Sequence, residues 1–174
     1  MLIDLSELLS TDNKKAEYTT KIEMDEFVIN DSVYPIGDKG DVILCIQNVG
    51  KRKLTVKAEI HCSLDIPCDR CLENVNQRFD ISIAKEIDMS RLSGDNEDGE
   101  EYPFIVENSF DVERFVYNEI LVNMPMKILC SDDCKGICNR CGANLNTQPC
   151  DCDRTELDPR MSKILDVFNK FKEV

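Results

Sequence analysis

Hydrophobic and polar residues alternate between positions 54 and 66, and this alternation predicts a long β-strand. Every second residue is apolar, namely Leu54, Val56, Ala58, Ile60, Cys62, Leu64 and Ile66. The residues between them are polar, so one face of the strand should be buried and the other solvated. After PCDRCLEN the alternation resumes with Val75, Phe79, Ile81, Ile83 and Ile87. Gln77 and Lys85 interrupt it, but two such strands around a short connection predict a hairpin.

Further strands are predicted before this hairpin. The run DVILCIQNV at 41–49 is apolar enough for a central strand, and Gly37 and Gly40 before it are typical of turns. The short runs EFVIN and SVYPI suggest two shorter strands. The front of the chain is therefore predicted to be mostly antiparallel β-sheet.

A helix is predicted at about 111–123. Its apolar residues recur at helical spacing, and these are Val112, Phe115, Val116 and Ile120. Asp111 is a candidate N-cap, and Pro125 lies just beyond the expected end. This helix should pack on the sheet.

The last residues, DPRMSKILDVFNKFKEV, predict an amphipathic helix. Asp158 would cap it, and Pro159 would occupy its first position. One stripe of its surface is apolar and consists of Met161, Ile164, Leu165, Phe168 and Phe171. Docking of this stripe on the protein's own core is favoured over binding to a partner.

Together these elements predict an α+β fold, with a mostly antiparallel β-sheet or partial barrel and packed helices. Residues 1–125 would form an acidic β-rich domain, and residues 126–174 a Cys-rich zinc-binding segment that ends in the amphipathic helix. An acidic loop is expected at 90–101, SRLSGDNEDGEE. Its carboxylates do not match the spacing of an EF-hand calcium site.

The formal net charge is −13, and the excess lies in the front of the chain. Residues 126–174 carry eight basic and eight acidic residues, whereas residues 1–125 carry 13 basic and 26 acidic ones. Such a surface disfavours unaided, sequence-independent binding to nucleic acid and favours basic protein partners, although acidity also simply keeps proteins soluble.

A cytoplasmic location is expected, without a membrane partner. The start, MLIDLSELLS, lacks a basic region before an apolar stretch, and no later run reaches the ~18 apolar residues of a membrane span. In a reducing compartment, clustered thiols are more often metal ligands than disulfides.

Six of the ten cysteines lie between positions 130 and 152, and this cluster predicts one structural zinc ion. The turn CNRCG and the pair CDC would face each other, and the expected ligands are Cys138, Cys141, Cys150 and Cys152. Cys134 and Cys130 are alternates, and which two of the six are not ligands stays open. Four thiolates leave no open position for catalysis. A disulfide or an iron–sulfur cluster is the competing interpretation.

The second cysteine motif, CDRC, lies in the connection of the predicted hairpin. Cys68 and Cys71 could be half of a metal site, a redox pair or a structural turn, and the structural role is favoured because redox motifs normally precede a helix. Arg70 could bind a phosphate or carboxylate, or be a plain surface charge. The single histidine, His61, falls on the polar strand face. No catalytic motif is found, so neither an enzyme nor a small-molecule substrate is expected.

Several motifs together resemble the YceD family of bacterial and plastid proteins. They are the turn at Cys68–Leu72, Pro125 after the helix, the block DCKGICNRCGANLN, the pair CDC, and DPR at Asp158–Arg160. The resemblance covers about residues 40–170. It implies a non-enzymatic factor needed for the accumulation of large-subunit ribosomal RNA, without implying a mechanism. Some members keep the C-x-R-C turn but lack the later cysteines, which implies that the shared function lies nearer the β-rich front.

Three hypotheses follow. The first is a ribosome biogenesis factor that binds a large-subunit ribosomal protein or a pre-ribosomal particle. The second is a zinc-dependent module that binds ribosomal RNA through basic residues near the metal, which are Lys135, Arg140, Arg154 and Arg160. The third is a thiol redox protein that uses Cys68 and Cys71.

Overall fold

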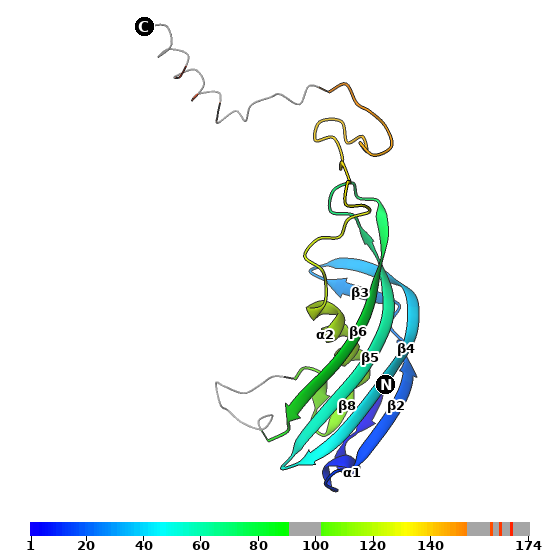
Figure 1. Ribbon diagram of the computed structural model, residues 1–174, viewed down its shortest axis with the longest axis vertical. Coiled ribbons are helices and arrows are strands. Elements are labelled where there is room, and N and C mark those ends of the chain that lie inside the picture. The colour runs from blue at the N-terminus through cyan, green and yellow to red at the C-terminus, as the bar shows by residue number, and fades with distance from the viewer. Residues whose placement is uncertain (91–101, 153–160, 162–163, 165–167, 169–174) are drawn as a thin grey trace.

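A curved antiparallel sheet dominates the protein (Figure 1), whose computed structural model describes residues 1–90, 102–152, 161, 164 and 168. In spatial order its strands are β2 (Lys15–Lys21), β4 (Ser32–Gly50), β5 (Lys53–Pro67) and β6 (Asn74–Asp88). β3 (Glu26–Ile29) pairs with the first part of β4. The long strands β4, β5 and β6 run side by side and carry most of the sheet.

The predicted hairpin is confirmed as β5 and β6. The two strands pair antiparallel along their whole length, with Ile60 opposite Ile81 and Leu54 opposite Ile87. All seven apolar residues of the alternation in β5 are buried. The period of two therefore predicted both the strand and its buried face.

The run at 41–49 is confirmed as part of a central strand, but Gly37 and Gly40 do not form a turn. Both lie inside β4, which also contains the SVYPI run, and the pairing with β5 shifts register on either side of Lys39. A Cβ atom at Gly40 would lie 2.4 Å from the carbonyl oxygen of His61. These glycines thus mark a bulge and a close backbone approach, which resemble a turn in sequence.

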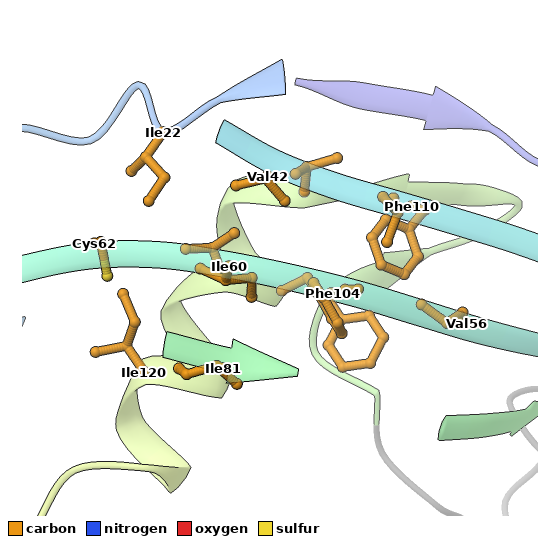
Figure 2. Packing of buried hydrophobic residues seen from close by; sticks show 14 of the residues in the cluster. Ile22, Val42, Val56, Ile60, Cys62, Ile81, Phe104, Phe110 and Ile120 are labelled. Atoms are coloured by element: carbon orange, nitrogen blue, oxygen red, sulfur yellow. The ribbon is translucent and has the colours of Figure 1, made fainter. Parts of the chain in front are cut away.

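The helix predicted at about 111–123 is confirmed as α2 (Val112–Val122). The Asp111 side chain caps it by accepting from the N–H groups of Glu113 and Arg114. Its apolar side packs on the concave face of the sheet, and Figure 2 shows Ile120 among the core side chains near Cys62 and Ile81. This packing fixes where the chain enters the cysteine-rich segment (residues 126–152).

Lys85, which interrupts the alternation in β6, has a partner on α2. Its ammonium group forms an ion pair with Glu119, whose side chain is only 2% exposed. The inward-facing lysine therefore neutralises a buried carboxylate, which explains the polar residue at a core position.

The elements at the start of the chain, β2 included, and the short strands just before α2 were not predicted. β1 (Leu2–Asp4) pairs with β8 (Ser109–Asp111), which pairs with β7 (Ile105–Val106), and α1 (Ser6–Leu9) follows β1. These strands are too short to show a period. β1 is held by a partner distant in sequence, whereas β7 and β8 form a short hairpin. Buried rings pack against these strands, and Figure 2 shows Phe104 and Phe110 among the core side chains.

Two predicted features lie wholly or largely outside the described residues, namely the acidic loop at 90–101 and the C-terminal amphipathic helix. Of the apolar stripe of that helix, Met161, Ile164 and Phe168 are described, and all three are exposed. For these three side chains the expected docking on the core is therefore not confirmed. Among the helices of the described residues, none is long and apolar enough to cross a membrane.

Candidate metal centre

The cysteine-rich segment runs from α2 to the far end of the β5–β6 hairpin (Figure 1), and eight cysteines meet there in two groups of four. The proximal group, at the hairpin, consists of Cys68, Cys71, Cys130 and Cys134. The distal group, within the segment itself, consists of Cys138, Cys141, Cys150 and Cys152. Within each group the four sulfur atoms lie within 4.8 Å of one another. Each group could therefore hold a metal ion.

The sulfur distances in the proximal group fit ligands around one ion. The Sγ atoms of Cys68 and Cys134 are 3.8 Å apart, and those of Cys71 and Cys130 are 3.5 Å apart. A tetrahedral ion with metal–sulfur distances of about 2.3 Å requires sulfurs about 3.8 Å from one another. A disulfide requires about 2.05 Å, and all ten cysteines are free. The spacing is thus that of separate thiols facing a common centre.

The turns CDRC and CNRC have the same backbone form. The residue after the second cysteine donates its N–H to the carbonyl of the first cysteine, at 3.0 Å from Leu72 to Cys68 and 2.9 Å from Gly142 to Cys138. The N–H of each first cysteine donates to the carbonyl five residues later, at 2.8 Å in both turns. Leu72 and Gly142 both have positive φ, at 63° and 72°. The two turns are therefore copies of one local structure.

Backbone and side-chain N–H groups point at the sulfurs of the proximal group. The Sγ atom of Cys68 accepts from the N–H groups of Arg70 at 3.5 Å and Cys130 at 3.3 Å. Burial raises the pKa of Cys68, but these donors outweigh burial and lower it to about 6. The Asn146 amide donates to the Sγ of Cys134 at 3.3 Å and lowers its pKa. These hydrogen bonds therefore stabilise the thiolate forms of both sulfurs.

The pKa values of the remaining thiols of the proximal group are raised. The N–H of Glu73 lowers the pKa of Cys71, but burial and the three neighbouring thiols outweigh this effect and raise the pKa to about 12. The pKa of Cys130 is also raised, mainly by its hydrogen bond to Cys134. Each thiolate makes the next one harder to form because like charges repel at this distance. A divalent cation at the centre would remove this conflict.

The distal group repeats this pattern with more exposure. The N–H groups of Cys141 and Arg140 lower the pKa of Cys138 to about 6. The hydrogen bond to Cys141, followed by burial, raises the pKa of Cys152 to about 12. Cys138 is buried, Cys141 is exposed, and the other two are half-buried. This donor set also fits a divalent ion.

The structure thus brings together the four residues predicted as zinc ligands, Cys138, Cys141, Cys150 and Cys152. It places the two alternates, Cys130 and Cys134, with Cys68 and Cys71 and not in the distal group. The cysteine spacing predicts one ion, with the CDRC turn outside its expected ligand set, whereas the described residues contain two groups that could each hold one. The sequence signal for the proximal group was the repeat of C-x-R-C in the two turns.

Arg70 makes contacts within the protein. Its Nη1 atom donates to the carbonyl oxygen of Cys134 at 2.9 Å and to that of Asp132 at 3.5 Å. Its own carbonyl accepts from the N–H of Ile137 at 3.0 Å. Arg70 therefore joins the hairpin to the cysteine-rich segment on both sides of Cys134.

Further hydrogen bonds connect the hairpin to the segment. Asp69 and Ile128 are joined twice, by the N–H of Asp69 to the carbonyl of Ile128 at 2.8 Å and by the N–H of Ile128 to the Asp69 carboxylate at 2.7 Å. The Asn144 amide donates to the Glu73 carboxylate at 2.7 Å. The distal turn is thus held against the proximal one.

A surface cavity of about 490 Å³ lies beside the distal group. Its lining is largely polar and consists of Lys135, Leu145, Asn146, Thr147, Gln148, Pro149 and Cys150. Of the other basic residues named from the sequence, Arg140 is described, whereas Arg154 and Arg160 lie outside the described residues.

Residues 56–168 match a family described as large ribosomal RNA subunit accumulation protein YceD. The chain belongs to the YceD family. The match begins in β5 and includes the eight cysteines of both groups, so the resemblance seen in the sequence is confirmed.

Relatives include a chloroplastic protein of Arabidopsis thaliana named large ribosomal RNA subunit accumulation protein YCED homolog 1. It is 26% identical over 135 residues, which cover 62% of this chain and 42% of the relative. The uncharacterized YlbN of Bacillus subtilis is 24% identical over 85% of both chains. The uncharacterized Rv2926c of Mycobacterium tuberculosis is 26% identical over 58% of this chain and 49% of its own. This chain thus aligns with less than half of the length of the plant and mycobacterial proteins. No solved structure matches significantly.

Proposed function

We propose that this protein is a non-enzymatic ribosome biogenesis factor in the cytoplasm that supports the accumulation of large-subunit ribosomal RNA. The observation that carries the proposal is the match of residues 56–168 to the YceD family, whose description names this RNA. The plant relative carries the same words in its name.

The charge of the chain supports action by binding a large-subunit ribosomal protein or a pre-ribosomal particle. Residues 1–125 carry 26 acidic against 13 basic residues. Proteins that bind RNA backbones are rich in lysine and arginine, and an acidic surface attracts them and shields them from other anions. The acidic protein would hold a basic ribosomal protein until that partner binds the RNA.

The distal group supports a structural role for its metal. We propose that Cys138, Cys141, Cys150 and Cys152 bind one zinc ion. Four thiolates fill a tetrahedral ion and leave no position for water or substrate, so the ion would stabilise the segment. The single histidine, His61, is exposed, and its Nδ1 lies 2.8 Å from the Asp80 carboxylate.

Sedimentation of cell extract tests the proposal. The protein should co-migrate with a large-subunit precursor and leave it at high salt, because charge contacts are screened. Depletion of the protein should lower large-subunit RNA relative to small-subunit RNA. The proposal fails if crosslinked pull-downs recover neither large-subunit proteins nor their RNA precursor.

Treatment with ribonuclease separates a protein partner from an RNA partner. A ribosomal protein bound directly should stay attached after the RNA is digested, whereas contact through RNA should be lost. Loss of every large-subunit protein after digestion would contradict direct binding to a ribosomal protein.

The cavity beside the distal group favours a second candidate, direct binding of ribosomal RNA. Lys135 and the Gln148 amide line it and offer donors to phosphates and base edges. The variant Lys135→Gln should then weaken binding to RNA fragments and lower its salt dependence. Lys57→Gln, on the outer face of the sheet, is the matched control. Equal affinity of both variants would count against this candidate.

The third candidate is thiol redox chemistry at Cys68 and Cys71. The lowered pKa of Cys68 favours it, but the turn leads into β6 and not into a helix, and the sulfurs face two further thiols. An assay of disulfide reduction with the Cys71→Ser variant as control tests this candidate, which is removed if both proteins are equally inactive.

A further inference from the structure

We propose that the proximal group, Cys68, Cys71, Cys130 and Cys134, is a second structural zinc site that fastens the cysteine-rich segment to the β5–β6 hairpin. This proposal goes beyond the proposed function, which needs only the distal ion. Neither group's ligands contribute to the other, so the two sites can be counted separately.

The ligands of the proximal group come from two distant parts of the chain. Cys71 and Cys130 are 59 residues apart, and Cys68 and Cys134 are 66 residues apart. Yet their sulfurs lie 3.5 and 3.8 Å apart, which is the spacing around one tetrahedral ion.

The surroundings of the sulfurs are those of a closed site. Cys68, Cys71 and Cys134 are 0%, 5% and 4% exposed and form a small cluster of their own, apart from the main core. Three N–H groups, from Arg70, Cys130 and Asn146, point at two of the sulfurs. Such donors offset the excess negative charge of four thiolates around a divalent ion.

The close spacing favours a single ion over an iron–sulfur cluster. Cysteines that ligate a cluster are divided among two or more irons, and the sulfurs on different irons are separated by the cluster itself. In the proximal group every sulfur is within 4.8 Å of every other, so the enclosed space suits one ion. Thiolate ligands in a tetrahedral arrangement with no open position are typical of structural zinc.

The same contacts make Arg70 a positioning residue for this site. Its guanidinium group holds the carbonyl of Cys134, and its carbonyl holds the N–H of Ile137, next to the first cysteine of the distal group. A Cβ atom at Gly136 would lie 3.0 Å from the Arg70 carbonyl oxygen, so the two backbones are in close contact. A zinc ion at the proximal group would therefore also fix where the distal group begins.

Metal content measured by native mass spectrometry tests the proposal. The protein, purified under reducing conditions with zinc sulfate, should carry about two zinc ions. The double variant Cys71→Ser/Cys130→Ser should carry about one, and so should Cys141→Ser/Cys152→Ser. The control Cys45→Ser removes a cysteine outside both groups and should keep both ions. The proposal is overturned if the wild-type protein binds one ion and Cys71→Ser/Cys130→Ser still binds it.

A measurement on the wild-type protein covers the case in which a double variant does not fold. Cys130 and Cys141 are exposed and belong to different groups, so both should be alkylated readily after chelation. Added zinc should slow alkylation at both by roughly tenfold or more, because a metal-bound thiolate is a poor nucleophile. Cys45 serves as the internal reference. Protection of Cys141 with no change at Cys130 would overturn the proposal. Neither measurement depends on ribosome association, so either proposal can fail alone.

Discussion

The proximal and distal groups use the same C-x-R-C turn, but they are attached to the protein differently. The proximal turn joins two long strands of a sheet, and three of the four cysteines of the proximal group are buried. The distal turn lies in a segment without regular strands or helices among its described residues, and only Cys138 of its group is buried. One local structure can thus either anchor a segment to a folded domain or close a loop within that segment. The difference comes from what surrounds the turn.

Removal of metal should have the largest effect, and it should fall on the stability of the cysteine-rich segment. Structural zinc sites contribute about 10 kcal/mol or more to the folding of the residues around them. Chelation should therefore speed hydrogen exchange roughly tenfold or more across residues 126–152, because their order would be lost. The strand β5 should remain protected between residues 54 and 66, since its side chains belong to the separate main core. Exchange that rises equally in both regions would show that the segment and the sheet unfold together.

A smaller effect is expected at the ion pair between the sheet and α2. Lys85→Met would leave the Glu119 carboxylate, 2% exposed, without its cation. This change should lower the free energy of unfolding by about 1–3 kcal/mol. Chemical denaturation measures it, with Lys57→Met on the outer face as control. The metal content should stay as in the wild-type protein, because the pair is remote from both groups.

Arg70→Gln should affect the proximal group more than the distal one. The loss of the hydrogen bond to the Cys134 carbonyl would weaken the site by about 1 kcal/mol, or roughly fivefold in metal affinity. Competition with a chromogenic chelator measures this affinity. Arg78→Gln, an exposed arginine of β6, is the matched control. An unchanged proximal affinity would show that the guanidinium group does not position the ligands.

The smallest effect is expected at the residue with positive φ in each turn. Leu72 has φ of 63° and a side chain 63% exposed, so Leu72→Gly should relieve strain and change stability by no more than about 1 kcal/mol. Gly142→Ala, the reciprocal change, should destabilise the distal turn by about 1 kcal/mol. Thermal unfolding and metal affinity measure both. A large loss from Leu72→Gly would indicate that the exposed leucine makes a contact of its own.

Much of the sheet could be predicted because its signals are local. The alternation of β5 fixed its buried face, and Asp111 marked the start of α2 through a hydrogen-bonding preference within a few residues. Lys85 in β6 could only be recorded as an interruption, because its partner lies on α2. Gly40 resembled a turn residue because its reason, the backbone of His61, lies on the neighbouring strand.

The candidate metal centre likewise has one part that the local sequence predicted and one part that it did not. The distal cysteines lie within one stretch, so their spacing alone predicted the set of Cys138, Cys141, Cys150 and Cys152 that the structure brings together. The sequence by itself also determined the family, the charge and the two matching turns. Only the tertiary structure decided that Cys68 and Cys71 meet Cys130 and Cys134, because the hairpin and the segment after α2 reach the same place through the packing of α2 on the sheet. No local pattern encodes a meeting of residues that the chain separates by 59 or 66 positions.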